Sequence, residues 1–290
     1  MAPLLIVALV LFQAVISLRT ELVAVPVTVT DDRGRQVRDL TQDNFRVLED
    51  GRPQPVTVFH QGDGPITLGL IVDRSQSMRS KSRALLTAVS AVLKSARPDD
   101  ELFGVGFHDD VEFAAAGAEP FTSDPRRLEA ALSAIPNTGM TALYDGVAAG
   151  LDRLRSGRFE HKVLIVISDG GDNASTRTFA DVVTLARRTD AVIYAIGLLG
   201  TDGAGDEEDS GLIKRLCKDT GGVAYFPKST EELIALSTRV ALDIREQYTL
   251  GFAPGATDGR QAFRRIEVIV SAKAHGRLHV RTRSGYIVAP

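Results

Sequence analysis

An unbroken apolar run at residues 68–72 (LGLIV), followed directly by Asp73, constrains the fold of this chain more than any other stretch. Because apolar and polar residues do not alternate, the run predicts a strand that is buried on both faces, as in parallel sheets. Ser75 and Ser77 follow Asp73 at alternate positions, ahead of a long helical pattern. Ligand sites in open parallel sheets lie beyond the carboxyl ends of the strands. One carboxylate and two hydroxyls on a short turn there indicate a hard-oxygen site suited to Mg²⁺.

Two later stretches carry residues of the same kind. Thr141 lies in the segment TGMTALYDG, at the point where a helical pattern begins. A second apolar run starts at Val163 (VLIVISDGG) and predicts another buried strand, which ends in Asp169. If both strands belong to one parallel sheet, Asp169 and Asp73 lie at the same edge of it.

This order of residues resembles the metal-ion-dependent adhesion site of von Willebrand factor A domains: Asp-x-Ser-x-Ser, then a Thr that opens a helix, then an Asp that ends a strand. Asp73, Ser75, Ser77, Thr141 and Asp169 occupy all five positions. The resemblance implies a bound Mg²⁺, with Mn²⁺ or Ca²⁺ as alternatives, held by the three hydroxyls and by the aspartates directly or through water. It also implies a non-enzymatic adhesion or assembly module whose ion accepts a Glu or Asp side chain from a protein partner.

The surroundings of the predicted site depart from the family in one place. Many members have Gly between the two serines, where this chain has Gln76. The ligands are unaffected, but Gln76 brings a large side chain to the partner-binding rim, which we predict to consist of Gln76, Arg74 and Met140. Asp145 and Asp172 are expected beside the site as supporting or helix-end residues rather than as ligands.

Other interpretations of these residues stay open at this stage. Ser77 and Thr141 could serve only as helix caps. Asp73 could be the nucleophile of a Mg²⁺-dependent phosphatase, although such enzymes generally want a second adjacent acid and a lysine, and neither Arg74 nor Ser75 fills those roles. A third alternative is a structural envelope protein with an unused site.

Nucleotides and nucleic acids are not expected as ligands. No Gly-x-Gly-x-x-Gly motif or phosphate loop follows the first buried strand, so nucleotide binding lacks its backbone cradle. The net charge is −3, from 34 basic and 37 acidic residues, which gives no electrostatic case for nucleic acid.

The wider pattern predicts two structural units. Strands alternate with helices over residues 63–246, which predicts a doubly wound, Rossmann-like, mostly parallel sheet covered on both faces. Residues 20–62 and 247–290 contain further short strands, and each segment is too short for a core of its own. We therefore predict that both segments form one β-rich domain around an inserted α/β domain. Valines alternate from residue 23 to 29, and Pro26 favours an edge position for that strand.

The start of the chain indicates export. Residues 3–16 are apolar except for Gln13, which is typical of the core of a secretory signal peptide and short for a membrane span. We assign residues 1–19 to a signal peptide or an N-terminal anchor, with a buried strand as the alternative. The segment VPVTVTD before the α/β domain and Arg-x-Arg-x-Gly-Tyr after it also look like exported bacterial proteins of the same family. These features imply the cell envelope, the periplasm or the medium, with membrane contact only through the anchor.

Two remaining features have mainly structural interpretations. The acidic segment 201–210 follows a predicted strand and is expected to be a solvated loop near the metal site, with calcium binding as the alternative. Cys217 is the only cysteine, so the chain forms no internal disulfide. It follows Ile213 and Leu216 at helical spacing, which predicts a buried structural thiol.

Overall fold

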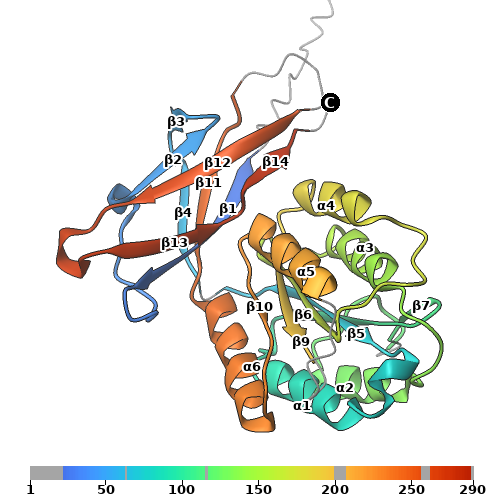
Figure 1. The fold of residues 1–290 in the computed structure, drawn as a ribbon. Helices are drawn as coiled ribbons and strands as arrows, with labels where there is room; N and C mark the ends of the chain where they lie inside the picture. Colours follow the sequence, from blue (N-terminus) through green and yellow to red (C-terminus); the bar gives the residue numbers. More distant parts are fainter. Residues whose placement is uncertain (1–21, 63, 115–116, 199–206, 256–261, 289–290) are drawn as a thin grey trace, which may run out of the picture.

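The computed structural model describes residues 22–62, 64–114, 117–198, 207–255 and 262–288. These residues form an α/β part and a β-rich part (Figure 1). The predicted signal peptide or anchor at residues 1–19 and the acidic positions up to residue 206 lie outside the described ranges. Residues 207–209 begin helix α5 (Glu207–Thr220) rather than continuing the predicted loop.

The α/β part is built on a six-stranded sheet. Its order is β10 (Ala224–Tyr225), β9 (Val192–Gly197), β8 (Lys162–Ser168), β5 (Thr67–Asp73), β6 (Glu101–Phe107) and β7 (Val111–Phe113). All neighbouring strands are parallel except the β6–β7 pair. Every residue of β5 is buried, which is why its sequence lacks alternation. The predicted doubly wound, mostly parallel sheet is confirmed.

Helices cover both faces of this sheet (Figure 1). One core packs β5 residues Leu70 and Val72 against α1 (Ser82–Leu93), α2 (Pro125–Ala134) and α6 (Thr230–Arg245). The other packs Ile71 against α3 (Leu143–Leu154), α4 (Phe179–Arg187) and α5, and it contains the buried thiol of Cys217. Within the described ranges, no helix combines the length and the apolar character needed to cross a membrane.

The β-rich part consists of two antiparallel four-stranded sheets. One has the order β13 (Leu278–Thr282), β1 (Val23–Asp31), β11 (Tyr248–Phe252), β4 (Val58–Gln61), and the other β14 (Gly285–Ile287), β12 (Phe263–Val270), β2 (Phe45–Glu49), β3 (Arg52–Gln54). Each sheet combines strands from both ends of the chain, and the apolar faces share one core. The prediction of a single β-rich domain made from the two terminal segments is confirmed.

The predicted edge position of the first strand is wrong, because β1 pairs with β11 on one side and β13 on the other. The β1–β13 pairing begins only at Val27, opposite Thr282. The carbonyl of Pro26 faces that side and accepts a hydrogen bond from Thr282 Oγ1 at 2.7 Å. In an antiparallel strand the N–H and C=O of one residue point to the same side. The nitrogen of Pro26 therefore also faces β13, but it lies beyond the last β1–β13 pair, so its missing N–H removes no hydrogen bond from that ladder.

The two parts meet at the edge of the large sheet where its strands begin. Arg245, the last residue of α6, pairs with the buried carboxylate of Asp100, which precedes β6. Asp100 also accepts backbone hydrogen bonds from Ile66 at 3.1 Å and Arg97 at 2.7 Å. One carboxylate thus ties the end of the last helix to the starts of two central strands.

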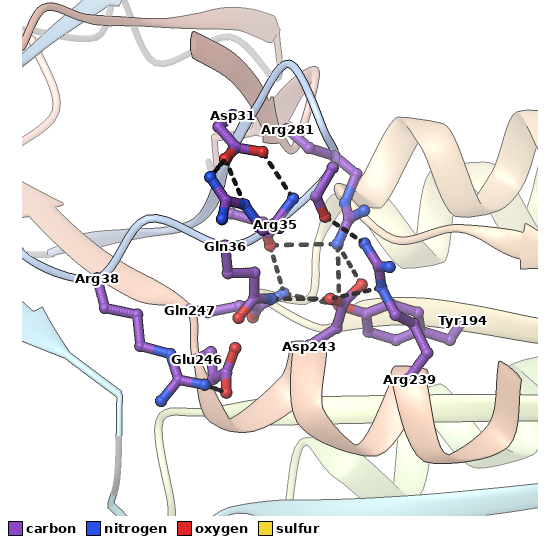
Figure 2. A network of polar contacts seen from close by, with 12 residues as sticks. Asp31, Arg35, Gln36, Arg38, Tyr194, Arg239, Asp243, Glu246, Gln247 and Arg281 are labelled. Atoms are coloured by element: carbon purple, nitrogen blue, oxygen red, sulfur yellow. Dashed lines mark hydrogen bonds and ion pairs between the residues drawn. The ribbon is translucent and has the colours of Figure 1, made fainter. Parts of the chain in front are cut away.

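A buried polar network extends this junction into the β-rich part (Figure 2). Gln247, which follows α6, donates a hydrogen bond to Tyr194 Oη of β9 at 2.9 Å. Asp243 of α6 is 2% exposed and accepts hydrogen bonds from Gln36 at 2.8 Å and Arg281 at 3.0 Å. Because Gln36 and Arg281 come from the β-rich part, side chains as well as short chain connections join the two parts.

Candidate metal site

The predicted ligands gather where the strand order of the sheet reverses. The chain passes from β5 to β6 on one side and later returns to β8 on the other side of β5. Asp73 is the last residue of β5, and Asp169 directly follows the end of β8. The carboxyl ends of two adjacent parallel strands at a topological switch point form the usual ligand site of an open α/β sheet.

The carboxylate of Asp73 is held rigidly and is fully buried. Its Oδ1 accepts a hydrogen bond from the backbone N–H of Ser75 at 2.9 Å. Its Oδ2 accepts one from the hydroxyl of Ser168 at 2.6 Å, and that hydroxyl in turn accepts the N–H of Gly170 at 3.0 Å. Sequence reasoning missed Ser168, although a polar residue at the end of an apolar strand is a usable signal.

The three predicted hydroxyl ligands lie on two loops. Ser75 Oγ and Ser77 Oγ are 2.9 Å apart, with Ser75 buried and Ser77 exposed on the short 3₁₀ helix Gln76–Arg79. Thr141 is buried, and its backbone N–H donates to Asn173 Oδ1 at 2.8 Å. Neither Ser77 nor Thr141 is a helix cap, since the N-cap residues of α1 and α3 are Lys81 and Ala142. Capping therefore does not account for these two residues.

Asp169 has a cationic neighbour that sequence reasoning also missed. The ammonium of Lys81 lies 2.9 Å from Asp169 Oδ2. Both side chains are largely shielded, with exposed fractions of 24% for Lys81 and 15% for Asp169. Lys81 follows Ser77 by four residues, so its proximity to the motif was visible in the sequence, but its pairing with Asp169 was not.

Two of the three predicted rim residues face solvent. Gln76 is exposed, and its backbone N–H donates to the carbonyl of Gly139 at 3.0 Å. The side chain of Met140 is 55% exposed, while its N–H donates to Asp109 Oδ1 at 2.9 Å. These contacts join three loops at the edge of the sheet and hold Met140 at the surface.

Arg74, which we expected at the rim, is instead buried, with 6% of its surface exposed. Its Nε donates to the carbonyl of Ile135 at 2.7 Å and its Nη2 to the carbonyl of Ser133 at 3.4 Å. Both acceptors lie at the C-terminal end of α2, where carbonyls lack partners within the helix and attract cations. Arg74 therefore fastens the loop after β5 to α2 and does not reach a partner.

Asp145 in the first turn of α3 and Asp172 in the loop after β8 connect these two segments beside the site, in line with expectation. Asp172 Oδ1 accepts the N–H of Tyr144 at 3.1 Å. Asp145 accepts the backbone N–H groups of Thr176 at 2.8 Å and Arg177 at 3.1 Å. Burial alone would raise the pKa of Asp145, but these hydrogen bonds outweigh it and lower the pKa. The two aspartates thus bind α3 to the loop that carries Asp169.

The residues present fit a divalent cation by their donor chemistry. In the described part of the chain, no basic side chain forms an ion pair with Asp73, whose hydrogen bonds come from neutral donors. Burial raises the pKa of the Asp73 carboxyl, because a desolvated charge lacks compensation there. A hard cation would supply that compensation, and hydroxyl oxygens complete its preferred donor set. No cluster of three or more His, Cys, Asp or Glu side chains suited to a metal occurs among the described residues.

Comparison with known proteins found a family match within the α/β part. Residues 68–171 match the family model of the von Willebrand factor type A domain. Among solved structures, von Willebrand factor type A from Catenulispora acidiphila aligns with a TM-score of 0.55 and 10% identity, over 82% of this chain and 71% of the other. A comparison with curated proteins gave no match.

A second similar structure is the PilB minor pilin from Streptococcus sanguinis, with a TM-score of 0.50 and 13% identity. The alignment covers 67% of this chain and 64% of the pilin, so this chain spans less than two thirds of that protein. At such low sequence identities, these two structural alignments show a shared fold and no closer relationship. The match over residues 68–171, the shared fold and the observed strand order are those of a von Willebrand factor A domain.

Proposed function

We propose that this protein is a non-enzymatic, Mg²⁺-dependent protein-binding module. In this proposal Asp73, Ser75, Ser77, Thr141 and Asp169 hold the ion, directly or through water. The observation that carries it is the Asp73 carboxylate, which is fully buried at the switch point of the sheet without an ion pair in the described residues. Burying such a charge is costly unless a cation compensates it.

The residues around Asp73 orient the donors of this site. Hydrogen bonds from Ser75 N–H and Ser168 Oγ fix both oxygens of Asp73, so its position does not depend on solvent. Ser77 is exposed, and its hydroxyl lies 2.9 Å from the hydroxyl of the buried Ser75. When bound, the ion supplies positive charge that attracts an anionic oxygen. A Glu or Asp side chain of a partner is the matching ligand, because Mg²⁺ prefers carboxylate oxygen.

The rim adds an apolar contact to this polar site. Met140 is an exposed large apolar residue at the same sheet edge, and Gln76 lies beside it through the Gly139 contact. A flexible thioether side chain suits an adaptable binding surface. We therefore propose a partner segment that carries an apolar residue next to its acidic one. Export through residues 1–19 agrees with an adhesion or assembly role in the envelope or outside the cell.

The phosphatase alternative is less well supported by the geometry. A nucleophilic aspartate must present a free oxygen to the phosphorus atom. Both oxygens of Asp73 instead accept hydrogen bonds, at 2.9 Å and 2.6 Å, and the residue is 0% exposed. The lysine near the site, Lys81, pairs with Asp169 rather than with Asp73.

Calorimetric titration of the purified protein with Mg²⁺ and Mn²⁺ tests the proposal. We expect one stoichiometric site, which Asp73→Ala abolishes while the circular dichroism spectrum stays native. Asp152→Ala is the matched control, because Asp152 is an exposed carboxylate of α3 and should leave the isotherm unchanged. The proposal fails if the protein binds neither ion or if Asp73→Ala binds as well as the unchanged chain. Capture of partners with Mg²⁺, with EDTA and after Mg²⁺ restoration then identifies the ligand.

A further inference from the structure

Lys81 brings a permanent positive charge to the proposed metal site. Its ammonium lies 2.9 Å from Asp169 Oδ2, in a contact that is mostly shielded from water. Among the five proposed ligands, as far as the structure describes the chain, Asp169 alone forms an ion pair. The electrostatic character of the site therefore depends on a residue outside the five-residue motif.

The backbone holds Lys81 in this place. Its N–H donates to the carbonyl of Met78 at 3.0 Å, and its own carbonyl accepts the N–H of Leu85 at 2.9 Å in the first turn of α1. Met78 is fully buried, and its N–H donates to the carbonyl of Ser75 at 3.2 Å. Lys81 thus belongs to the same folded segment as the two serines, and the contact with Asp169 holds its side chain.

We propose that Lys81 is an internal counter-ion that weakens the binding of metal alone and makes tight metal binding depend on an anionic partner. This inference rests on the function proposed above. The Asp73 and Asp169 carboxylates and the Lys81 ammonium carry one net negative charge, so a divalent ion leaves the loaded site with one net positive charge. A partner carboxylate then brings the site to neutrality.

Linkage gives this arrangement a functional consequence. If the carboxylate raises the affinity for the ion, the ion raises the affinity for the carboxylate by the same factor. Without Lys81 the metal-loaded site is already neutral, and a carboxylate gains less from it. Two charges separated by a few ångströms near a protein surface interact strongly enough to change the affinity for metal alone by about 10- to 100-fold.

The test is a calorimetric titration of the full chain with Mn²⁺ alone. Lys81→Met and Lys81→Gln both remove the charge, and the glutamine keeps an N–H donor for Asp169 if the methionine disturbs folding. We expect both to bind Mn²⁺ about 10- to 100-fold more tightly than the unchanged protein. Lys81→Arg keeps the charge and should stay within about twofold. Lys94→Met, at the exposed far end of α1, is the control for loss of a distant lysine.

A second titration adds acetate as the carboxylate probe. Acetate should raise the Mn²⁺ affinity of the unchanged protein by a larger factor than that of Lys81→Gln. If the unchanged protein binds one Mn²⁺ and the neutral variants bind it no more tightly, the role of Lys81 is refuted while the proposed function stands. If no variant binds Mn²⁺, the proposed function falls and the inference falls with it.

Discussion

At the edge of the large sheet where its strands begin, the buried carboxylate of Asp100 is paired with Arg245, and the carboxylate of Asp243 with Arg281. At the opposite edge, Asp73 is buried as deeply but contacts only neutral donors. The pKa values differ accordingly. Burial raises the pKa of Asp73, whereas at Asp100 the hydrogen bonds from Arg245 and backbone amides outweigh burial and lower it.

The difference separates a structural edge from the proposed binding edge of the same sheet. At the first edge, fixed protein cations satisfy the charges: Arg245 pairs with Asp100 inside the α/β part. Arg281 of the β-rich part pairs with Asp243 of α6 and joins the two parts (Figure 2). At the second edge, the buried carboxylate of Asp73 has no ion-pair partner among the described residues, at a cost in stability that functional sites commonly carry. The first edge should therefore respond to mutation in stability, and the second in ligand binding.

The largest expected effect is at the structural edge. Arg245→Met leaves Asp100 buried and unpaired, so the free energy of unfolding should fall by about 3–5 kcal/mol. Urea unfolding followed by circular dichroism measures it, and the double variant Arg245→Met with Asp100→Asn should recover part of the loss. Mn²⁺ affinity of the folded fraction should stay unchanged. A loss below about 1 kcal/mol, the range of exposed ion pairs, would contradict a structural role for this pair.

The next effect is a pH dependence at the same edge. His161 precedes β8, and its Nε2 lies 3.2 Å from Gln247 Oε1. The charged groups near it are Arg245 and Asp100. Burial lowers the pKa of His161 to about 4. The folded state disfavours protonated His161, so protonation lowers the free energy of unfolding. The contribution of neutral His161 to stability is complete above its unfolded pKa of about 6.5, and it is lost as the pH falls toward 4.

Between pH 7.5 and pH 5 this loss amounts to about 2 kcal/mol in the free energy of unfolding. Denaturant unfolding at pH 7.5 and pH 5 of the unchanged protein and of His161→Gln measures it. The variant has no imidazole to protonate, so its stability should change less over this interval. Equal losses in the two proteins would show that His161 is hydrated in the folded state.

The residues of the proposed binding edge were predictable because each lies in or beside a recognisable local pattern. Asp73, Ser75 and Ser77 form one motif, and Thr141 and Asp169 adjoin recognisable helix and strand patterns. The doubly wound fold follows from the same alternation of buried strands and amphipathic helices. Residues at the ends of such strands converge on one edge whatever the loops do.

The structural edge gave no such signal. Asp100 and Arg245 are 145 positions apart, and neither adjoins a motif that points to the other. The direction of a single charged side chain was equally hidden. Arg74 follows a strand end and was expected to face solvent, but its guanidinium donates hydrogen bonds to carbonyls at the end of α2 and is buried there. Pairings between distant polar residues depend on the tertiary packing of helices, which periodicity does not encode.

The smallest effect returns to the binding edge, where Gly139 has a φ of +69°. A Cβ atom there would lie 1.8 Å from Asp109 Oδ2, so Gly139→Ala must both adopt an unfavourable φ and displace the carboxylate that holds Met140 N–H. We expect a loss of about 1–2 kcal/mol in the free energy of unfolding.

Gly34→Ala is the matched control, because Gly34 has a φ of +71° and its nearest neighbour, Arg239 Nη2, would lie 3.8 Å from a Cβ. Its cost should be that of the φ angle alone, about 1 kcal/mol. If both variants lose the same stability, the Asp109 side chain moves aside without cost and the rim is not rigid. A larger loss for Gly139→Ala, together with weaker capture of an acidic partner, supports a rigid rim at the proposed binding edge.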